Sequence, residues 1–170
     1  WGGPADYWSL ILDVRKFLPL ADKHTVALFS LSTLQTGQAG IDVSIHQDFH
    51  IGGTNTIRGW SLDSRNGKHQ FINTVEYRFN VLQPRTFSIK GFTAHAGIQL
   101  AVFGDYGLAW NDRSEFTAGN FIGSYGVGVR ALVPYVDMLR FDFAYGESGE
   151  GVQFHFGIDE KAFMQRRRIR

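Results

Sequence analysis

Two carboxylates in this chain could carry acid–base chemistry. Glu76 and Asp105 both fall within segments that alternate between polar and apolar residues. A pair of carboxylates that share a site can supply a general acid and a general base. The same two groups can instead form a structural network of ion pairs, and this is the interpretation that we favour. We therefore predict no catalytic residue at these positions.

Other patterns that carry chemistry are incomplete. His46 and His50 have the spacing of zinc ligands on a helix, but they lie in a glycine-containing loop with no third ligand nearby in sequence. The segment 146–150, Gly-Glu-Ser-Gly-Glu, lacks the final glycine of a hydrolase nucleophile elbow. No phosphate-binding glycine loop precedes a helix. We expect no enzyme activity, no metal and no cofactor.

The composition limits the class of protein. A chain of 170 residues suits one domain. It contains 15% aromatic residues and 20 glycines, with a formal net charge of +1. No segment approaches the ~18 consecutive apolar residues of a membrane helix. The basic residues at 166–170 lack interleaved aromatic residues, so we expect no binding to nucleic acid.

A period of two between apolar and polar residues runs through most of the chain and predicts β-strands. In the segment 137–146, for example, Phe141 and Phe143 flank Asp142. The segment 24–35 also has the composition of a strand, but its facing is ambiguous. The fold class is therefore all-β. The predicted strands are 7–18, 24–35, 71–81, 97–110, 121–133, 137–146 and 151–158.

The alternation fits two environments. In a soluble sheet the apolar face forms the core, whereas in a membrane barrel it contacts lipid and the charged residues line a wet interior. The predicted strands are longer than the usual five or six residues. Aromatic residues such as Trp8, Trp110 and Tyr145 lie near strand ends, as they do at membrane interfaces. These features favour a transmembrane antiparallel β-barrel.

The connections between strands alternate in character. Every second connection contains a proline, which is excluded from the middle of a sheet; these connections are 19–23, 82–92 and 134–136. The intervening connections are rich in Gly, Asn, Asp and Ser, and they are 36–68, 111–120 and 146–150. Tight turns on one side and long loops on the other are typical of membrane barrels. The loop 36–68 is too long to be idle in a compact domain.

The tip of this long loop is unusual for a solvated segment. Residues 51–60 read Ile-Gly-Gly-Thr-Asn-Thr-Ile-Arg-Gly-Trp. The glycines permit tight and left-handed backbone, while the two large apolar side chains after them gain nothing from exposure to water. We expect the loop to fold back and bury its tip, which comprises Ile57, Arg58, Gly59 and Trp60.

The tip also resembles a known family. An Arg-Gly-aromatic tip after Gly-Gly-x-Asn is similar to the inward-folded loop of the BamA/TamA-type outer-membrane assembly barrels, also called the bacterial surface antigen family. Further segments match in the family's order over essentially 7–158. They are the strand at 13–20, Val-Glu-Tyr-Arg-Phe at 75–79, Phe-x-Asp-x-Gly-x-x-Trp at 103–110, Gly-Val-Gly-Val-Arg at 126–130, the strand at 139–145, and a closing-strand signal of Gly151, Phe154 and Phe156.

This resemblance implies a fold and a function. The family barrel has sixteen strands, and the matched segments correspond to its C-terminal half, so that about seven to eight strands are present. The family's loop arginine contacts acidic residues that correspond to Glu76 and Asp105, so Arg58 is expected to pair with them inside the barrel. The implied role is the insertion or translocation of polypeptides at the bacterial outer membrane. The implied partners are outer-membrane lipid and unfolded or nascent polypeptide clients.

We expect two regions in the chain. Residues 1–158 would form the barrel strands with the inward loop at 36–68, and residues 159–170 would form a basic C-terminal tail, which is either a solvated end or a contact for anionic headgroups.

Seven strands cannot close around a folded-in loop, and a bare strand edge is costly in lipid. The edges 7–18 and 151–158 are therefore expected to pair with missing N-terminal barrel strands or with a second copy. Two alternatives stay open. One is a minimal pore-forming or dimerising barrel without periplasmic domains, and the other is a soluble ligand-binding β-barrel.

Overall fold

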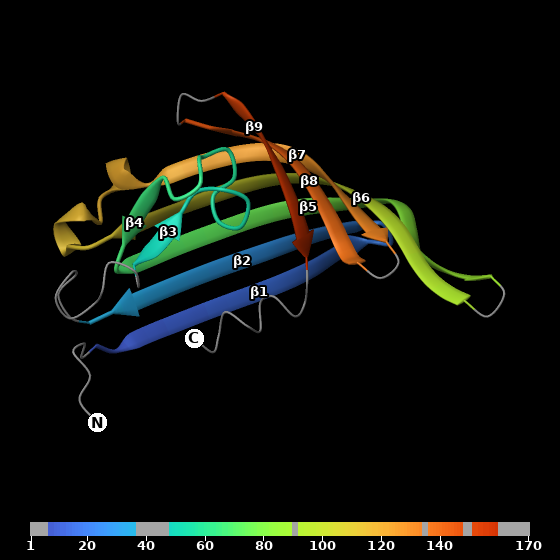
Figure 1. The fold of residues 1–170 in the computed structure, drawn as a ribbon, viewed down its shortest axis with the longest axis horizontal. Helices are drawn as coiled ribbons and strands as arrows, with labels where there is room; N and C mark the ends of the chain where they lie inside the picture. Colours follow the sequence, from blue (N-terminus) through green and yellow to red (C-terminus); the bar gives the residue numbers. More distant parts are fainter. Residues whose placement is uncertain (1–6, 37–47, 90–91, 134–135, 148–150, 160–170) are drawn as a thin grey trace.

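The computed structural model describes residues 7–36, 48–89, 92–133, 136–147 and 151–159. Seven antiparallel strands form one sheet in the order β1-β2-β5-β6-β7-β8-β9 (Figure 1). The all-β class and the number of strands are therefore as predicted. The strands are β1 (Ser9–Ala21), β2 (His24–Gln35), β5 (His69–Ile89), β6 (Phe92–Trp110), β7 (Ile122–Val133), β8 (Val136–Gly146) and β9 (Val152–Asp159).

The long loop between β2 and β5 contains a hairpin that the sequence did not predict. Its strands β3 (Phe49–Ile51) and β4 (Arg65–Gly67) pair antiparallel and form a separate two-stranded sheet. Figure 1 shows the main sheet as a curved surface, with β3, β4 and the loop between them lying over one face. The hairpin therefore holds both ends of the tip 52–64 above that face. The loop after β6 contains two short 3₁₀ turns, η2 (Arg113–Glu115) and η3 (Ala118–Asn120).

The alternation of side chains matches the pleat of a sheet with one polar and one apolar face. Phe143 and Phe154 are register partners on β8 and β9, and they are 54% and 56% exposed. Asp142 and His155, the adjacent pair in the register, are 0% and 7% exposed beneath the loop. The apolar side chains thus lie on the outer face, and the charged side chains lie on the face that the loop covers.

The strand β2 has a definite facing, although its sequence is ambiguous. Thr33 is buried, and its Oγ1 accepts a hydrogen bond from Nε2 of Gln70 at 3.2 Å. Ala27 is also buried and lies opposite Glu76 in the register. Odd-numbered residues of β2 therefore face the loop. The small and apolar residues on both faces hide this periodicity in the sequence.

The predicted connection at 82–92 is wrong, because β5 and β6 continue through it as a long hairpin. The register between them shifts near Leu82 and again before Arg85, and Pro84 lies within this irregularity. A bulge accommodates a residue without an N–H, so proline here bends the ladder without ending it. Pro19 similarly lies inside β1, which is an edge strand, next to a register shift. Pro134 lies outside the described residues.

The sheet is open. Its edges are β1 and β9, and no pairing joins these two strands within the described part of the chain. The fold is therefore a partial β-barrel. No helix among the described residues is long and apolar enough to cross a membrane.

Candidate functional site

The loop tip is held in shape by its own backbone. The N–H of Gly52 donates to Oγ1 of Thr56, and that hydroxyl donates back to the carbonyl oxygen of Gly52, both at 2.8 Å. The N–H of Gly53 donates to the carbonyl oxygen of Trp60 at 2.9 Å. Gly52 and Gly53 adopt φ values of 114° and 89°, which side-chain-bearing residues rarely adopt. The tip therefore forms a closed turn that projects Ile57 and Arg58 toward the sheet.

An apolar cluster lies between the tip and the sheet. Ile51 and Ile57 are fully buried. They pack against Ile72 on β5, Ala109 on β6 and Ile122 on β7. Burial of a side chain of this size contributes roughly 1.5–3 kcal/mol. The loop is thus attached to the sheet by hydrophobic contacts from three strands.

Arg58 makes its closest contacts with Asp105 on β6. Its Nε and Nη2 lie 2.7 Å and 2.8 Å from the two carboxylate oxygens, and its backbone N–H also donates to Oδ2 of Asp105 at 3.1 Å. The guanidinium plane lies over the ring of Phe103, with its Cζ 3.3 Å from the ring centroid. A planar fork stacked on an aromatic ring and bound to both carboxylate oxygens is a geometry specific to arginine.

The third nitrogen of Arg58 reaches two further strands. Nη1 lies 3.3 Å from Oε2 of Glu76 on β5 and 3.1 Å from Oδ2 of Asp142 on β8. All of these side chains are at most 4% exposed. Burial lowers the pKa of the Arg58 guanidinium, but the hydrogen bond and charge of Asp105, with the charges of Asp142 and Glu76, raise it above its usual range. One fully charged group thus connects the loop to β5, β6 and β8.

Arg130 on β7 supplies a second cation beneath the loop. It binds Glu76 through Nη2 at 2.8 Å and Asp142 through Nη1 at 2.5 Å, and it is 1% exposed. Gly128 lies opposite Asp142 in the register, and any Cβ there would overlap the Asp142 carboxylate. The Gly-Val-Gly-Val-Arg segment therefore combines a cation with the space for its carboxylate partner.

The end of the tip binds β9 and the backbone of β7, and it lies against β8. The N–H of Gly59 donates to Nε2 of His155 at 2.8 Å. The indole N–H of Trp60 donates to the carbonyl oxygen of Gly123 at 2.9 Å. A Cβ on Gly146 would lie 2.6 Å from the Trp60 ring. The tip thus contacts the sheet from β5 to its edge strand β9.

The family model of the Omp85 superfamily domain matches residues 1–161. The chain belongs to the Omp85 superfamily. The predicted resemblance to outer-membrane assembly barrels is confirmed by this match. Members of the superfamily are outer-membrane proteins that insert or translocate proteins.

A curated relative supports the same assignment. The chain is 30% identical over 141 residues to Outer envelope protein 80, chloroplastic, of Arabidopsis thaliana. The match covers 77% of this chain but only 17% of that protein, so the chain spans a small part of the relative's length.

In this Omp85 domain, the structure brings the predicted tip residues and carboxylates into one buried cluster. Ile57, Arg58 and Gly59 are buried, and Trp60 is half-buried. The closing-strand residues lie elsewhere. Gly151 precedes β9 with φ 78°, and Phe154 and Phe156 are exposed on the outer face. Of the predicted tail at 159–170, Asp159 ends β9, and 160–170 lie outside the described residues.

Three members of the cluster were not identified from the sequence. They are Arg130, Asp142 and His155. The alternation of polar and apolar residues along each strand does indicate that these three side chains face inward. Parity alone does not show which inward residues meet the loop tip, because that depends on the stagger between strands. The curvature and stagger of the sheet select these three.

The cluster in the Omp85 domain lacks the arrangement of an acid–base site. Each of the carboxylates of Glu76, Asp105 and Asp142 lies within 3.4 Å of at least one arginine nitrogen. These ion pairs occupy the carboxylate oxygens that an acid–base reaction would need to reach. In the part of the chain described, no group of three or more His, Asp or Glu residues could hold a metal ion. Of the two histidines with zinc-ligand spacing, His50 lies in β3 and His46 lies outside the described residues. The arrangement is that of an electrostatic clamp.

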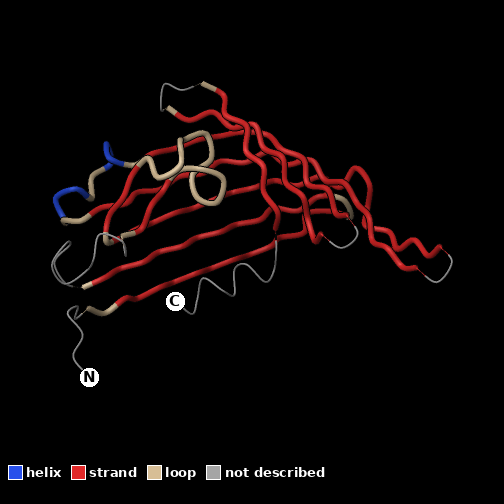
Figure 2. The backbone as a smooth tube through the Cα atoms, in the orientation of Figure 1, coloured by secondary structure: helices blue, strands red, loops and turns tan. Residues whose placement is uncertain are grey.

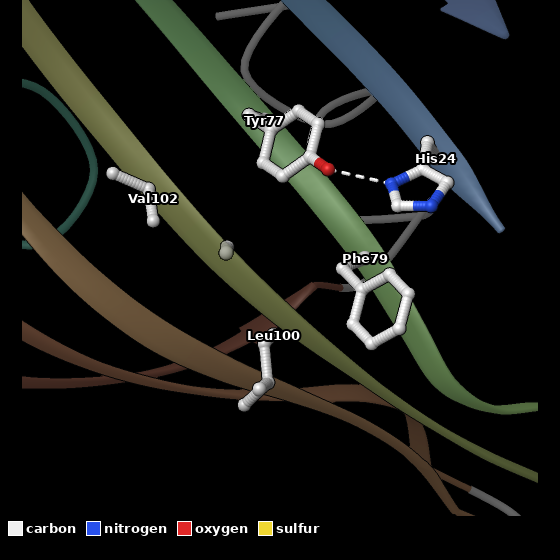
Figure 3. Close-up of a pocket in the computed structure, with 6 residues that line it drawn as sticks. His24, Tyr77, Phe79, Leu100 and Val102 are labelled. Atoms are coloured by element: carbon white, nitrogen blue, oxygen red, sulfur yellow. Dashed lines mark hydrogen bonds between the residues drawn. The ribbon is translucent and has the colours of Figure 1, made fainter. Parts of the chain in front are cut away.

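A shallow apolar hollow lies on the outer face, near the β1–β2 turn (Figure 3). Its walls come from β2, β5 and β6. In Figure 3 the imidazole of His24 and the phenol of Tyr77 point toward one another, and Nδ1 of His24 lies 2.5 Å from the Tyr77 hydroxyl. The hollow is lined by His24, Tyr77, Phe79, Leu100, Ala101 and Val102, which include no carboxylate.

Proposed function

We propose that this chain is a C-terminal barrel segment of an outer-membrane protein that inserts or translocates polypeptides, with Arg58 as the anchor of its inward loop. The observation that carries this proposal is the clamp between Arg58 and the carboxylates of Glu76, Asp105 and Asp142 on three strands. Membership of the Omp85 superfamily supports the same role.

The clamp couples the loop to the shape of the sheet. Because Arg58 binds β5, β6 and β8 at once, its contacts can form together only when these strands have the observed curvature. His155 extends the attachment to β9, which is an edge of the sheet. A loop that moves must therefore release the strands next to that edge. We infer that loop position regulates the pairing of β9.

A free strand edge is the chemically active feature of such a protein. An edge in lipid leaves backbone N–H and C=O groups without partners, and each unsatisfied group costs several kcal/mol. Such an edge pairs readily with another extended segment. The clients are therefore unfolded polypeptides, taken up as strands. The apolar outer face, which includes Val102 and Phe154, would contact outer-membrane lipid of a bacterium or an organelle.

The test uses the complete protein that contains this chain, reconstituted into liposomes. Insertion of an unfolded outer-membrane barrel client is followed by protease protection. Arg58→Ala and Arg58→Lys are compared with Arg113→Lys, because Arg113 is exposed in the short turn η2. We expect both Arg58 variants to lose most insertion activity while they remain folded by heat-modifiable gel mobility. Normal insertion by folded Arg58→Ala would contradict the proposal.

A second function is favoured by the open sheet. Because the outer edges of β1 and β9 have no partner strand in the described residues, a second copy could complete the barrel and form a pore. Conductance across a planar bilayer separates the two functions. A stable conductance from the purified chain, without client insertion, would favour the pore. Full solubility and monomeric behaviour without detergent would instead favour a ligand-binding barrel.

A further inference from the structure

The apolar hollow on the outer face, which we call the outer hollow, lies at the turn end of the sheet. His24 is the first residue of β2 and follows the turn at 22–23 that joins β1 to β2. Its register partner on β5 is Phe79, which pairs in turn with Leu100 on β6. Figures 1 and 2 show the loop tip over the inner face of the sheet, so the loop leaves the outer hollow uncovered.

Polar residues surround the turn beside the outer hollow. Asp22 and Lys23 are exposed, and Nε2 of Gln83 donates to the carbonyl oxygen of Asp22 at 3.3 Å. With the outer face in contact with lipid, as the proposed function requires, these residues mark the boundary between lipid and water. Val102 lies two residues beyond Leu100 on β6, or ~7 Å further from the turn. The outer hollow therefore begins at the boundary and extends into the apolar region.

The pair of His24 and Tyr77 retains one proton that it does not use. A neutral imidazole carries one N–H, and a phenol carries one O–H. The hydrogen bond between Nδ1 of His24 and the Tyr77 hydroxyl uses one of these two protons. The second proton lies either on Nε2 of His24 or on the phenol oxygen, and the described residues supply no acceptor for it. A polar hydrogen in lipid is costly without an acceptor, so the pair favours an occupant that accepts a hydrogen bond at the boundary.

The shape of the outer hollow suits an acyl chain. Its volume is about 400 Å³. In Figure 3 the rings of Tyr77 and Phe79 lie on the side of His24, and the shorter side chains of Leu100 and Val102 lie on the opposite side. Leu100 and Val102 are 47% and 56% exposed, so this open space covers only one side of an occupant. A site for a soluble apolar ligand buries most of the ligand surface. The occupant therefore needs apolar surroundings on its other side, as a bilayer lipid has.

We propose that the outer hollow binds one phospholipid of the leaflet on the turn side. An acyl chain lies against Leu100 and Val102, and a phosphate oxygen accepts the second proton of the His24–Tyr77 pair. Asp22 and Lys23 carry opposite charges in the adjacent turn, so the group recognised is the phosphate and not the net charge of the headgroup. The membrane placement of this site rests on the proposed function, and the site is separate from the loop clamp.

The experiment uses photolabelling of the complete protein that contains this chain, reconstituted into liposomes. The probe is a trace of phosphatidylethanolamine with a diazirine near the carbonyl end of one acyl chain. A diacylglycerol with the same chain lacks the phosphate and serves as the matched probe. Mass spectrometry gives the labelling of residues 98–102 relative to that of Phe143, which is exposed on the same face of β8. We expect this ratio to be roughly tenfold higher for the phospholipid, as for one hydrogen bond to a charged oxygen.

Variants separate the phosphate contact from the shape of the outer hollow. The double variant of His24→Phe with Tyr77→Phe keeps both rings but removes both polar tips, and it should lower the phospholipid ratio roughly tenfold. Each single variant keeps one donor and should retain much of the labelling. Leu100→Trp fills the outer hollow and should abolish the preference, whereas Phe154→Trp on β9 should not.

Two results would overturn the proposal. One is equal labelling of residues 98–102 and Phe143 by the phospholipid probe, and the other is an equal ratio for the diacylglycerol probe. Both measurements use the unmodified protein, so they decide the question even if the double variant does not fold. Excess phosphatidylglycerol and excess phosphatidylethanolamine should compete equally, and a tenfold preference for either, about 1.4 kcal/mol, would overturn recognition through the phosphate.

Client insertion is measured in the same liposomes. Insertion without preferential labelling of residues 98–102 would contradict only the phospholipid site. Preferential labelling without client insertion would contradict only the proposed function.

Discussion

The backbone N–H of Gly59 donates a hydrogen bond to Nε2 of His155, and Nδ1 of the same ring lies 3.2 Å from Oγ1 of Thr54. Because a backbone N–H can only donate, Nε2 must be unprotonated, so the proton of a neutral ring lies on Nδ1. One neutral imidazole on β9 therefore binds two points of the loop. The edge strand thus depends on a specific tautomer for its contact with the tip.

This relationship predicts that His155→Leu weakens loop docking. The buried Gly59 N–H would lose its acceptor at a cost of about 1–3 kcal/mol. His155→Gln retains a side-chain oxygen that can accept from this N–H, so it should have a smaller effect. Hydrogen exchange of the Gly59 amide in detergent measures the difference. Equal protection in His155→Leu and the unmodified protein would show that the contact is energetically unimportant.

Arg58 and Asp105 should be strongly coupled in stability. Arg58→Ala leaves buried carboxylates unpaired and should destabilise the fold by about 3–5 kcal/mol. Adding Asp105→Asn should recover part of this loss, because it removes one of the unpaired charges. Denaturant unfolding of the two single variants and the double variant gives the coupling energy.

The exposed pair of Arg15 and Asp13 provides the matched control for this comparison of single and double variants. Its guanidinium nitrogen and carboxylate oxygen are 2.8 Å apart, but the side chains are 38% and 20% exposed. Its coupling should be below about 1 kcal/mol. Similar coupling energies for the two pairs would show that burial of the Arg58 clamp does not increase its contribution.

Gly59→Ala should displace the tip, because the substitution causes both backbone strain and overlap. Gly59 has φ 79°, and its Cβ would lie 2.7 Å from the backbone nitrogen of Gly146. Gly151 has a similar φ of 78°, but its Cβ would meet nothing within 4 Å. Gly151→Ala should therefore cost only the strain, about 1–2 kcal/mol. Limited proteolysis of the loop should increase in Gly59→Ala alone, and equal cleavage of both variants would contradict the overlap argument.

The sequence was sufficient to predict the strands and the facing of most of them. The period of two correctly placed Phe143 and Asp142 on opposite faces. It was visible there because apolar and charged residues alternate. The period did not reveal the facing of β2, where serine, threonine and small apolar residues occur on both faces. It also failed at Pro84, where the register of two strands allows a bulge that sequence spacing does not reveal.

The clamp was only partly predictable for a related reason. The pairing of Arg58 with Glu76 and Asp105 came from the resemblance to a family, not from the spacing of these residues. Asp142 joins them because β8 lies two strands from β6 on a curved sheet. Contacts across such a curve depend on stagger and curvature, and neither property can be read from one strand's residues.

The two faces of the sheet should differ in their access to lipid. Val102 and Phe154 are both 56% exposed on the outer face. Fluorescent labels attached to cysteines substituted at these two positions should be quenched by lipid-phase quenchers in liposomes. Labels at Ala101 and Ala144, which are 3% and 0% exposed, test the loop-covered face and should be protected. A charge at the outer face near the membrane midplane should cost about 2–4 kcal/mol. Equal quenching on both faces would contradict a membrane-spanning sheet.

The final prediction concerns closure of the barrel. In the described residues, β1 and β9 lie at opposite edges of a seven-stranded sheet. A loop with a buried Arg58 and a half-buried Trp60 occupies its inner face, so the sheet cannot curl tightly enough to join these edges. Leu12→Cys on β1 with Phe154→Cys on β9 should therefore give disulfides between copies of the chain in mild detergent. Val127→Cys with Phe143→Cys, which are register partners on β7 and β8, should give a disulfide within one copy. In the complete protein, further strands should cover both edges and suppress the bonds between copies. A monomer with an internal Leu12–Phe154 bond would show that seven strands close alone, and would remove the need for any partner strand.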